Sequence, residues 1–490
     1  MTCLNQKGRF IKVMALVLVC LLGTMCIGAA LAKGATTKEG FTVTGPVKGG
    51  EHGWAFGAYY GDIGKLGYVE EEYFVEGVAQ RYAPENDELS EDGVWTLVPA
   101  TEEAYKTRFI VRRPIDPAKF NGTVIVEWAN VSGGYDISML NTPGIYEQGF
   151  AYVSALTQMN GIYGFEENPQ GLIAWDAERY GALSIPDDGL SYDIYTQIAR
   201  AVGPNRHTNG IDPMGGLEVK KLFALGESQS GSRVLSYANG VQPIEAVFDG
   251  IIPALNAGRG TDFEQAVAHV KEGGETKVRN VSAKVREDIN CKMFIINSQT
   301  ESVFMGNLVQ PDSENIRSLQ VAGASHSSPN LIADVSRRTD RDGLTQKYLQ
   351  AATRDTNVVD WADTVEAVFV QIQRWLDEGI APPSAEPMAT EGFAYKLDEH
   401  CNALGGIRMP DLEVPTAEYV VDMTKSGLAG YKMPFSPEKL LALYETHGIY
   451  VEKVTQAAKA AQEAGLILPY RAEEYIREAE AAPIPSAVAE

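Results

Sequence analysis

A serine at the end of an apolar run is the residue of this sequence best suited to chemistry. Residues 222–225 lead directly into Gly226-Glu-Ser228-Gln-Ser230-Gly, and helix-compatible sequence follows. A serine on such a strand-to-helix turn has a strained backbone, so the residues two before and two after it must be small. We therefore predict Ser228 as a nucleophile whose hydroxyl stands clear of the sheet. Two alternatives remain open: a shifted frame with Ser230 as the nucleophile, and a serine that only caps a helix.

A serine hydroxyl reacts only when a base takes its proton and a carboxylate orients that base. His326 lies in a loop of small residues after the last strand-like run, 318–322, which is the expected place for the base. The acid should follow the preceding strand, and Glu301 comes shortly after residues 292–297. Two other acids compete with it: Asp249 and Asp312. Two further histidines are interpreted as structural: His207 and His447.

The negative charge that develops on an attacked carbonyl oxygen needs two amide donors. We predict that Gln229, directly after the nucleophile, supplies one of them. The other is expected from the glycine-bearing loop after an early strand, at Asn130 or Val131, although a structural turn would have the same sequence. No His, Cys and carboxylate cluster has zinc spacing, and no phosphate or dinucleotide fingerprint follows a strand. We therefore expect neither metal nor cofactor.

The elements that would position these residues alternate between strands and helices. Continuously apolar runs separated by helix-length stretches are typical of a mainly parallel sheet covered on both faces. These runs are residues 123–128, 151–155, 221–226, 245–252, 292–297 and 318–322. Residues 42–111, with alternating runs and glycine clusters, predict antiparallel strands. Residues 256–290 are a candidate lid insertion, and residues 385–490 a helical C-terminal extension packed on the core.

Composition and charge predict a folded, exported protein. Of the 490 residues 44% are hydrophobic, and a net charge of -23 argues against binding to nucleic acid. Residues 1–32 combine a basic start, an apolar run and Ala30-Leu-Ala32, which predicts a signal cleaved after Ala32 and no stable membrane insertion afterwards. Cleavage leaves Cys291 and Cys401, which the sequence neither pairs nor separates. The oligomeric state is not defined by the sequence.

The turn Gly-Glu-Ser-Gln-Ser-Gly resembles the nucleophile elbow of a family of α/β-hydrolase domain proteins whose substrates are undefined. Further blocks occur in the family's order: residues 126–134, 175–183, 191–197, 298–301, 321–326 and 405–410. The resemblance implies an α/β-hydrolase fold over residues 33–490, with Ser228 as nucleophile, Glu301 as acid and His326 as base. It departs from many relatives at Gln299, where an acid is expected, so Glu301 is the only carboxylate in its tetrad.

Together these observations predict a secreted or periplasmic serine hydrolase that cleaves a small-molecule carboxylic ester. The reaction would use a Ser-His-Glu triad and pass through an acyl-enzyme. Two rival functions remain. The same triad could serve an acyltransferase or a lyase, and a degenerate hydrolase-like scaffold could bind a ligand without catalysis.

Overall fold

The structure is a computed structural model that describes residues 40–86, 89–206, 210–263, 280–345, 355–421 and 427–485. The predicted export signal, residues 1–32, lies outside the described residues, as does His207. All the elements named below belong to the unit Phe41–Glu490.

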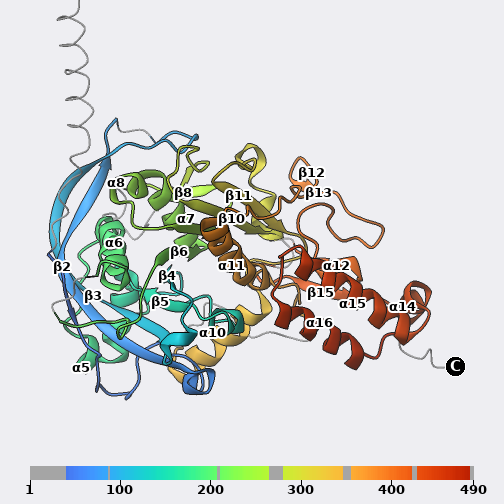
Figure 1. Ribbon diagram of the computed structural model, residues 1–490, viewed down its shortest axis with the longest axis horizontal. Coiled ribbons are helices and arrows are strands. Elements are labelled where there is room, and N and C mark those ends of the chain that lie inside the picture. The colour runs from blue at the N-terminus through green and yellow to red at the C-terminus, as the bar shows by residue number, and fades with distance from the viewer. Residues whose placement is uncertain are drawn as a thin grey trace, which may run out of the picture. The chain divides into compact units, whose positions relative to one another are not determined.

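A nine-stranded sheet runs through the described residues in the order β1-β2-β3-β5-β4-β6-β7-β10-β11 (Figure 1). Its strands are β1 Thr42–Thr44, β2 Tyr68–Pro84, β3 Leu97–Pro114, β4 Thr123–Trp128, β5 Ala151–Ala155, β6 Lys221–Glu227, β7 Gly250–Ala254, β10 Lys292–Ser298 and β11 Ile316–Val321. Neighbours from β5 to β11 are parallel, whereas β1, β2, β3 and β5 pair antiparallel in succession. The predicted mainly parallel sheet is confirmed.

Besides short 3-10 and π turns, the described residues form α-helices and three small ribbons. The helices are α2 Pro143–Glu147, α3 Met159–Tyr163, α4 Leu172–Trp175, α5 Ala177–Tyr180, α6 Ser191–Val202, α7 Gln229–Ser236, α8 Gln242–Glu245, α9 Gln299–Ser302, α10 Pro329–Arg341, α11 Ala362–Glu378, α12 Pro410–Glu413, α14 Pro437–Tyr444, α15 His447–Glu463 and α16 Pro469–Ala481. The ribbons pair β8 Arg259–Thr261 with β9 Asn280–Ser282, β12 Thr390–Glu391 with β13 Ala394–Tyr395, and β14 Ala417–Val420 with β15 Tyr431–Pro434.

Burial explains why the central strands are apolar throughout. Every residue of β4 and β5 is buried, because both faces of the sheet are covered there. The strand predicted at residues 245–252 is displaced to β7. Residues before it instead form α8, which ends at Glu245 and is capped by Ala246 with a left-handed φ of 48°. The Gln242 side chain then bonds to the main chain of Phe248, so the strand begins only at Gly250.

Helices cover both faces of the parallel part of the sheet (Figure 1). On one face, Trp128 of β4 packs against Tyr192 of α6, with 5.4 Å between ring centroids. On the other face, Gln373 of α11 donates to the Thr123 hydroxyl at 3.2 Å. The two faces differ because side chains alternate along a strand, and residues 123 and 128 are an odd number of positions apart. Strand β4 therefore lies between α6 and α11.

The C-terminal helices are attached to α11 by polar contacts. Arg471 of α16 donates to Asp363 at 2.9 Å, and the Tyr470 hydroxyl donates to Glu366. These two bonds hold α16 beside α11, the helix that packs on β10. Ser436 caps α14, since its hydroxyl accepts from the amide of Lys439 at 3.3 Å.

Only part of the predicted lid, residues 256–290, is described. In that part β8 pairs antiparallel with β9, and the Ser236 hydroxyl of α7 donates to the carbonyl oxygen of Thr261 at 2.8 Å. The start of the insertion is therefore fixed to the helix that follows Ser228.

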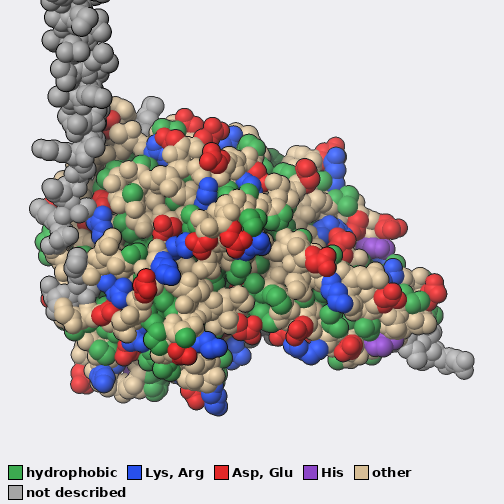
Figure 2. Space-filling view, viewed as in Figure 1, with side chains coloured by type: hydrophobic (Ala, Val, Ile, Leu, Met, Phe, Trp, Pro, Cys, Tyr) green, Lys and Arg blue, Asp and Glu red, His purple; other side chains and the backbone are tan. Residues whose placement is uncertain are grey.

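The two cysteines left open by the sequence are both free thiols, Cys291 buried and Cys401 exposed. Within the described ranges, no helix has the length and apolar character needed to cross a membrane. On the face shown in Figure 2, acidic and basic side chains are interspersed rather than separated into patches.

Candidate active site

Ser228 lies on a sharp turn between β6 and α7. Its backbone has φ 60° and ψ -120°, a conformation that residues other than glycine rarely adopt. Two glycines permit the turn: a Cβ on Gly226 would lie 2.5 Å from the carbonyl oxygen of Ser230, and one on Gly231 would lie 2.1 Å from that of Ala254. The Ser228 amide also donates to the Ala254 oxygen at 3.0 Å. The small residue two positions before Ser228 is therefore a steric requirement.

Ser230, the alternative nucleophile, is engaged inside the turn. Its side chain is fully buried; its hydroxyl donates to the carbonyl oxygen of Glu227 at 2.8 Å and accepts from the Glu227 amide at 3.2 Å. Ser228 is only half-buried, and its hydroxyl has no hydrogen-bond partner in the part of the chain that the structure describes. The geometry thus favours Ser228 as the reactive hydroxyl, while Ser230 braces the turn.

Glu301 and His326 are in direct contact. Oε1 of Glu301 lies 2.5 Å from Nδ1 of His326, and both side chains are buried. Glu301 stands in the first turn of α9, directly after β10, and Ser298 caps that turn. The hydroxyl and amide of Ser298 donate to Oε2 of Glu301 at 2.5 and 3.1 Å. The structure brings the predicted acid and base together and holds both oxygens of the acid.

The loop that carries His326 is fixed on both sides. The His326 amide donates to the Thr300 hydroxyl at 3.0 Å, and the indole of Trp361 donates to the His326 carbonyl oxygen at 3.0 Å. Gln299 joins the acid loop to the base loop, because its side-chain oxygen accepts from the Gly323 amide at 2.7 Å. These bonds restrict the imidazole to one position relative to Glu301.

The electrostatics around the pair leave one ring nitrogen for chemistry. Nδ1 of His326 is held by Glu301, whereas Nε2 has no hydrogen bond to any described residue.

Burial raises the pKa of the Tyr395 phenol, and the nearby Glu301 carboxylate raises it further. Tyr395 therefore stays protonated and donates to the carbonyl oxygen of Gln299, beside the acid.

The competing acids lie elsewhere. Asp249 accepts from the amide of Leu222 at 2.9 Å, at the start of β6 and thus at the opposite end of that strand from Ser228. Asp312 accepts from the amide of Ser318 at 3.1 Å. His447 is remote in sequence and bonds through Nδ1 to the carbonyl oxygen of Ile484 at 2.9 Å. Of the acids considered, Glu301 has the contact with His326.

The loop after β4 approaches the turn after β6. The side-chain amide of Asn130 donates to the carbonyl oxygen of Glu227 at 3.1 Å, which ties the two loops together. The main-chain amide of Asn130 is already used, because it donates to Ile137 O at 2.9 Å. The amides of Val131 and Gln229 make no hydrogen bond to described residues. Of the two oxyanion candidates on this loop, Val131 thus has the available amide.

Ser228 and His326 both follow strands at the carboxyl edge of the sheet. They follow β6 and β11, which are separated in the sheet by β7 and β10. No hydrogen bond joins their side chains among the described residues. Catalytic hydrogen bonds are often long in ligand-free structures and tighten when substrate binds, so proton transfer between the two requires such an approach.

Several supporting residues were not predicted from the sequence. Ser298 had a visible signal, because Ser298-Gln-Thr-Glu301 is a capping-box pattern after a strand. Thr300 and Trp361 had none, since their bonds to the His326 main chain depend on tertiary packing. Across the described ranges, no three His, Cys, Asp or Glu side chains gather so that they could hold a metal ion.

Comparisons with known proteins gave similar solved structures and one family match. The fold is similar to a glucuronoyl esterase from Solibacter usitatus, at 10% identity over 58% of this chain and 81% of that chain, with a TM-score of 0.26. It is also similar to the esterase Est22, at 10% identity over 56% of this chain and 78% of that chain, with a TM-score of 0.29. Comparison with curated protein sequences gave no match. Residues 43–477 match the alpha/beta hydrolase domain family, so the chain belongs to that family.

Proposed function

We propose that this protein is a serine hydrolase that cleaves a carboxylic ester, with Ser228, His326 and Glu301 as its triad. The observation that carries the proposal is the strained backbone of Ser228, which leaves a half-exposed hydroxyl without a hydrogen-bond partner among the described residues. Backbone strain of this kind persists only where the surrounding structure enforces it, and it clusters at active sites. The buried Glu301–His326 contact on the same sheet edge supplies the matching base.

The chemistry follows from the roles of the two ring nitrogens. Because Glu301 accepts from Nδ1, the neutral imidazole carries its proton there and presents the lone pair of Nε2. Nε2 takes the Ser228 proton as the hydroxyl oxygen attacks the ester carbonyl. The imidazolium that forms lies against the Glu301 carboxylate, which stabilises its charge.

The oxyanion of the tetrahedral intermediate would be held by the amides of Gln229 and Val131. Gln229 is the first residue of α7, so its amide points out of the helix N-terminus, where the helix dipole favours negative charge. His326 then returns its proton to the leaving alcohol. Water, activated by the same imidazole, attacks the acyl-enzyme and releases the acid and the free Ser228 hydroxyl.

The protein is proposed to act outside the cytoplasm after removal of residues 1–32. The basic start, apolar run and Ala30-Leu-Ala32 of that segment support this proposal. Peptide mapping of the purified extracytoplasmic protein should give a new N-terminus after Ala32; an intact N-terminal segment would contradict it.

The proposal is tested with a fluorophosphonate probe and a panel of p-nitrophenyl esters. Wild-type protein should be labelled and should hydrolyse at least one ester, whereas Ser228→Ala should lose both properties. Ser230→Ala is the matched control: it removes a neighbouring hydroxyl and should lower activity only through the brace on Glu227. Unchanged labelling of Ser228→Ala would refute the proposal. Transfer of the acyl group to an added alcohol in preference to water would replace hydrolysis with acyl transfer.

A further inference from the structure

Two glutamates lie side by side directly behind the nucleophile turn. Glu227 is the last residue of β6 and precedes Ser228, and Glu127 lies in the adjacent strand β4. Glu127 is level with Leu225, so the side chains of residues 127, 225 and 227 point to the same face of the sheet. Both carboxyls are fully buried. Neither is used by the mechanism proposed above, which leaves their presence to be explained.

The surroundings of the two carboxyls are unequal. Glu127 accepts from the Ser138 hydroxyl at 2.8 Å and from the main-chain amide of Met139. Both oxygens of Glu227 are sealed from solvent and accept no hydrogen bond from any described residue. A carboxylate deprived of water and of donors is strongly unfavourable, whereas a protonated carboxyl has its own O–H to donate. After burial, the largest influence on the pKa of Glu227 is the adjacent carboxyl of Glu127, which raises it.

Charge considerations assign the proton to Glu227. Burial raises the pKa of Glu227 well above its usual range, and the adjacent Glu127 raises it further. Burial also raises the pKa of Glu127, but the Tyr152 phenol, the Met139 amide and the Ser138 hydroxyl oppose that shift. Three buried groups on other elements interact electrostatically with the pair: Arg112 of β3, Tyr152 of β5 and Tyr195 of α6.

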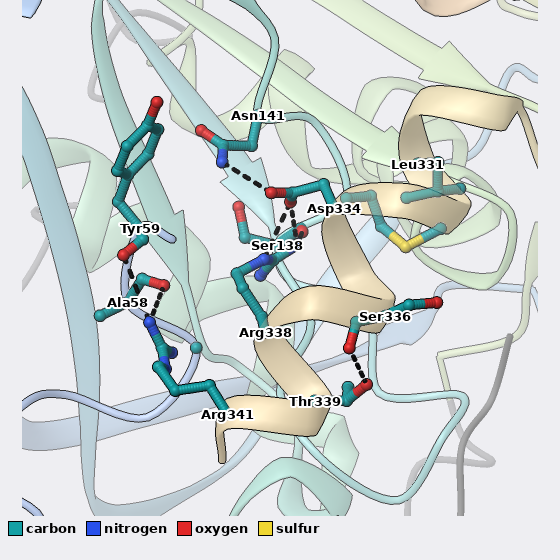
Figure 3. Close-up of polar contacts among 12 residues, drawn as sticks. Ala58, Tyr59, Ser138, Asn141, Leu331, Asp334, Ser336, Arg338, Thr339 and Arg341 are labelled. Carbon is teal, nitrogen blue, oxygen red and sulfur yellow. Dashed lines mark hydrogen bonds and ion pairs between the residues drawn. The ribbon is translucent and has the colours of Figure 1, made fainter. Parts of the chain in front are cut away.

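Glu127 is linked through Ser138 to α10, the helix that follows the His326 loop. Figure 3 shows Arg338 of α10, the helix that follows the His326 loop, directed at Ser138. Arg338 donates to the Ser138 carbonyl oxygen at 2.6 Å and pairs with Asp334, which accepts from Asn141 at 3.2 Å. The Ser138 hydroxyl in turn donates to Glu127. A continuous set of contacts therefore runs from α10 to the residue before Ser228.

We propose that Glu227 and Glu127 share one proton and that this pair positions the nucleophile turn. The Glu227 main chain connects the nucleophile turn to the loop after β4, because its carbonyl oxygen accepts from both Ser230 and Asn130. A hydrogen bond from the Glu227 side chain to Glu127 keeps this carbonyl oxygen in position. The shared proton also limits the pair to a single negative charge, which keeps a second charge away from the developing oxyanion. Loss of the proton at high pH leaves two adjacent carboxylates that repel each other. The turn then loses its fixed position, and kcat falls at alkaline pH. The two glutamates are positioning residues, and their role rests on the proposed function.

The decisive variants are Glu227→Ala and the conservative Glu227→Gln, whose amide can still donate to Glu127 without titrating. Glu227→Ala should lower kcat by about 100-fold with KM little changed, since small displacements of reacting groups have effects of this size. Glu227→Gln should restore most of that loss and remove the fall in kcat at alkaline pH. Asp249→Asn is the matched control, because it removes a half-buried carboxyl that accepts from Leu222 at the other end of β6. The control should keep the wild-type pH profile.

A second measurement does not depend on activity. Infrared spectra at pH 8 should show a protonated-carboxyl band in the wild type that is lost in Glu227→Gln and retained in Asp249→Asn. If Glu227→Gln keeps both the protonated-carboxyl band and the wild-type fall in kcat at alkaline pH, the two glutamates do not share a proton. That result would stand even if loss of labelling in Ser228→Ala supports the proposed hydrolase. Wild-type protein without labelling or turnover refutes the proposed function and the positioning role with it.

Discussion

Replacement of Glu301 by Gln separates the charge of the acid from its shape. The carboxylate accepts from Nδ1 of His326 at 2.5 Å and from Ser298 at 2.5 and 3.1 Å, so it has no spare oxygen for an amide nitrogen. A Gln side chain must therefore turn an N–H towards Nδ1 or towards the Ser298 donors. If it faces Nδ1, the imidazole carries its proton on Nε2 instead and cannot take the Ser228 proton.

The expected loss is about 10⁴-fold in kcat, the size found when a triad acid is neutralised and the tautomer reverses. This loss corresponds to about 5.4 kcal/mol of transition-state stabilisation. The assay is kcat on the best p-nitrophenyl ester, with the fluorophosphonate labelling rate as a second readout. Asp312→Asn is the control, because it neutralises the competing acid, which accepts from Ser318 instead. A Glu301→Gln enzyme within about tenfold of wild type would refute the assignment.

Three further predictions concern stability and geometry. Gly226→Ala places a Cβ 2.5 Å from the Ser230 oxygen, so it should lower the free energy of unfolding by about 1–3 kcal/mol in urea titrations; no change would contradict the steric argument. Trp361→Phe leaves the buried His326 carbonyl oxygen without its donor and should lower kcat more than it changes KM. Burial raises the pKa of Glu366 to about 7, so the folded state holds this proton more tightly than the unfolded chain. The contribution of Glu366 to the unfolding free energy should therefore fall by about 1.4 kcal/mol per pH unit between about pH 4.5 and 7, and a urea titration of Glu366→Gln at each pH should lack this contribution.

The positions of the strands that carry the site are predicted well from the sequence, whereas the contacts between those strands are not. β4 and β5 begin and end where the apolar runs at 123–128 and 151–155 predict, because strands buried on both faces need uninterrupted apolar side chains. The run at 245–252 predicts the start of its strand too early, since β7 begins only at Gly250; apolar side chains also suit a buried turn, and no local signal separates Phe248 from a strand residue.

The site shows the same division. Order along the chain was enough to place Glu301 and His326 after neighbouring strands, and their contact follows from the parallel sheet. Which main-chain amide of the β4 loop is free was not predictable, because the bond from Asn130 to Ile137 depends on how that loop folds back. The closeness of Glu127 and Glu227 likewise requires the strand order, which places β4 beside β6.

Locating the covalent label is the most direct test of the proposed triad. Wild-type protein is treated with a fluorophosphonate, digested and examined by tandem mass spectrometry. The proposed triad predicts a single phosphonylated serine at position 228, formed at a rate that falls when His326 is replaced by Ala. A label on Ser230, or labelling of Ser228 that does not depend on His326, would contradict the proposed triad.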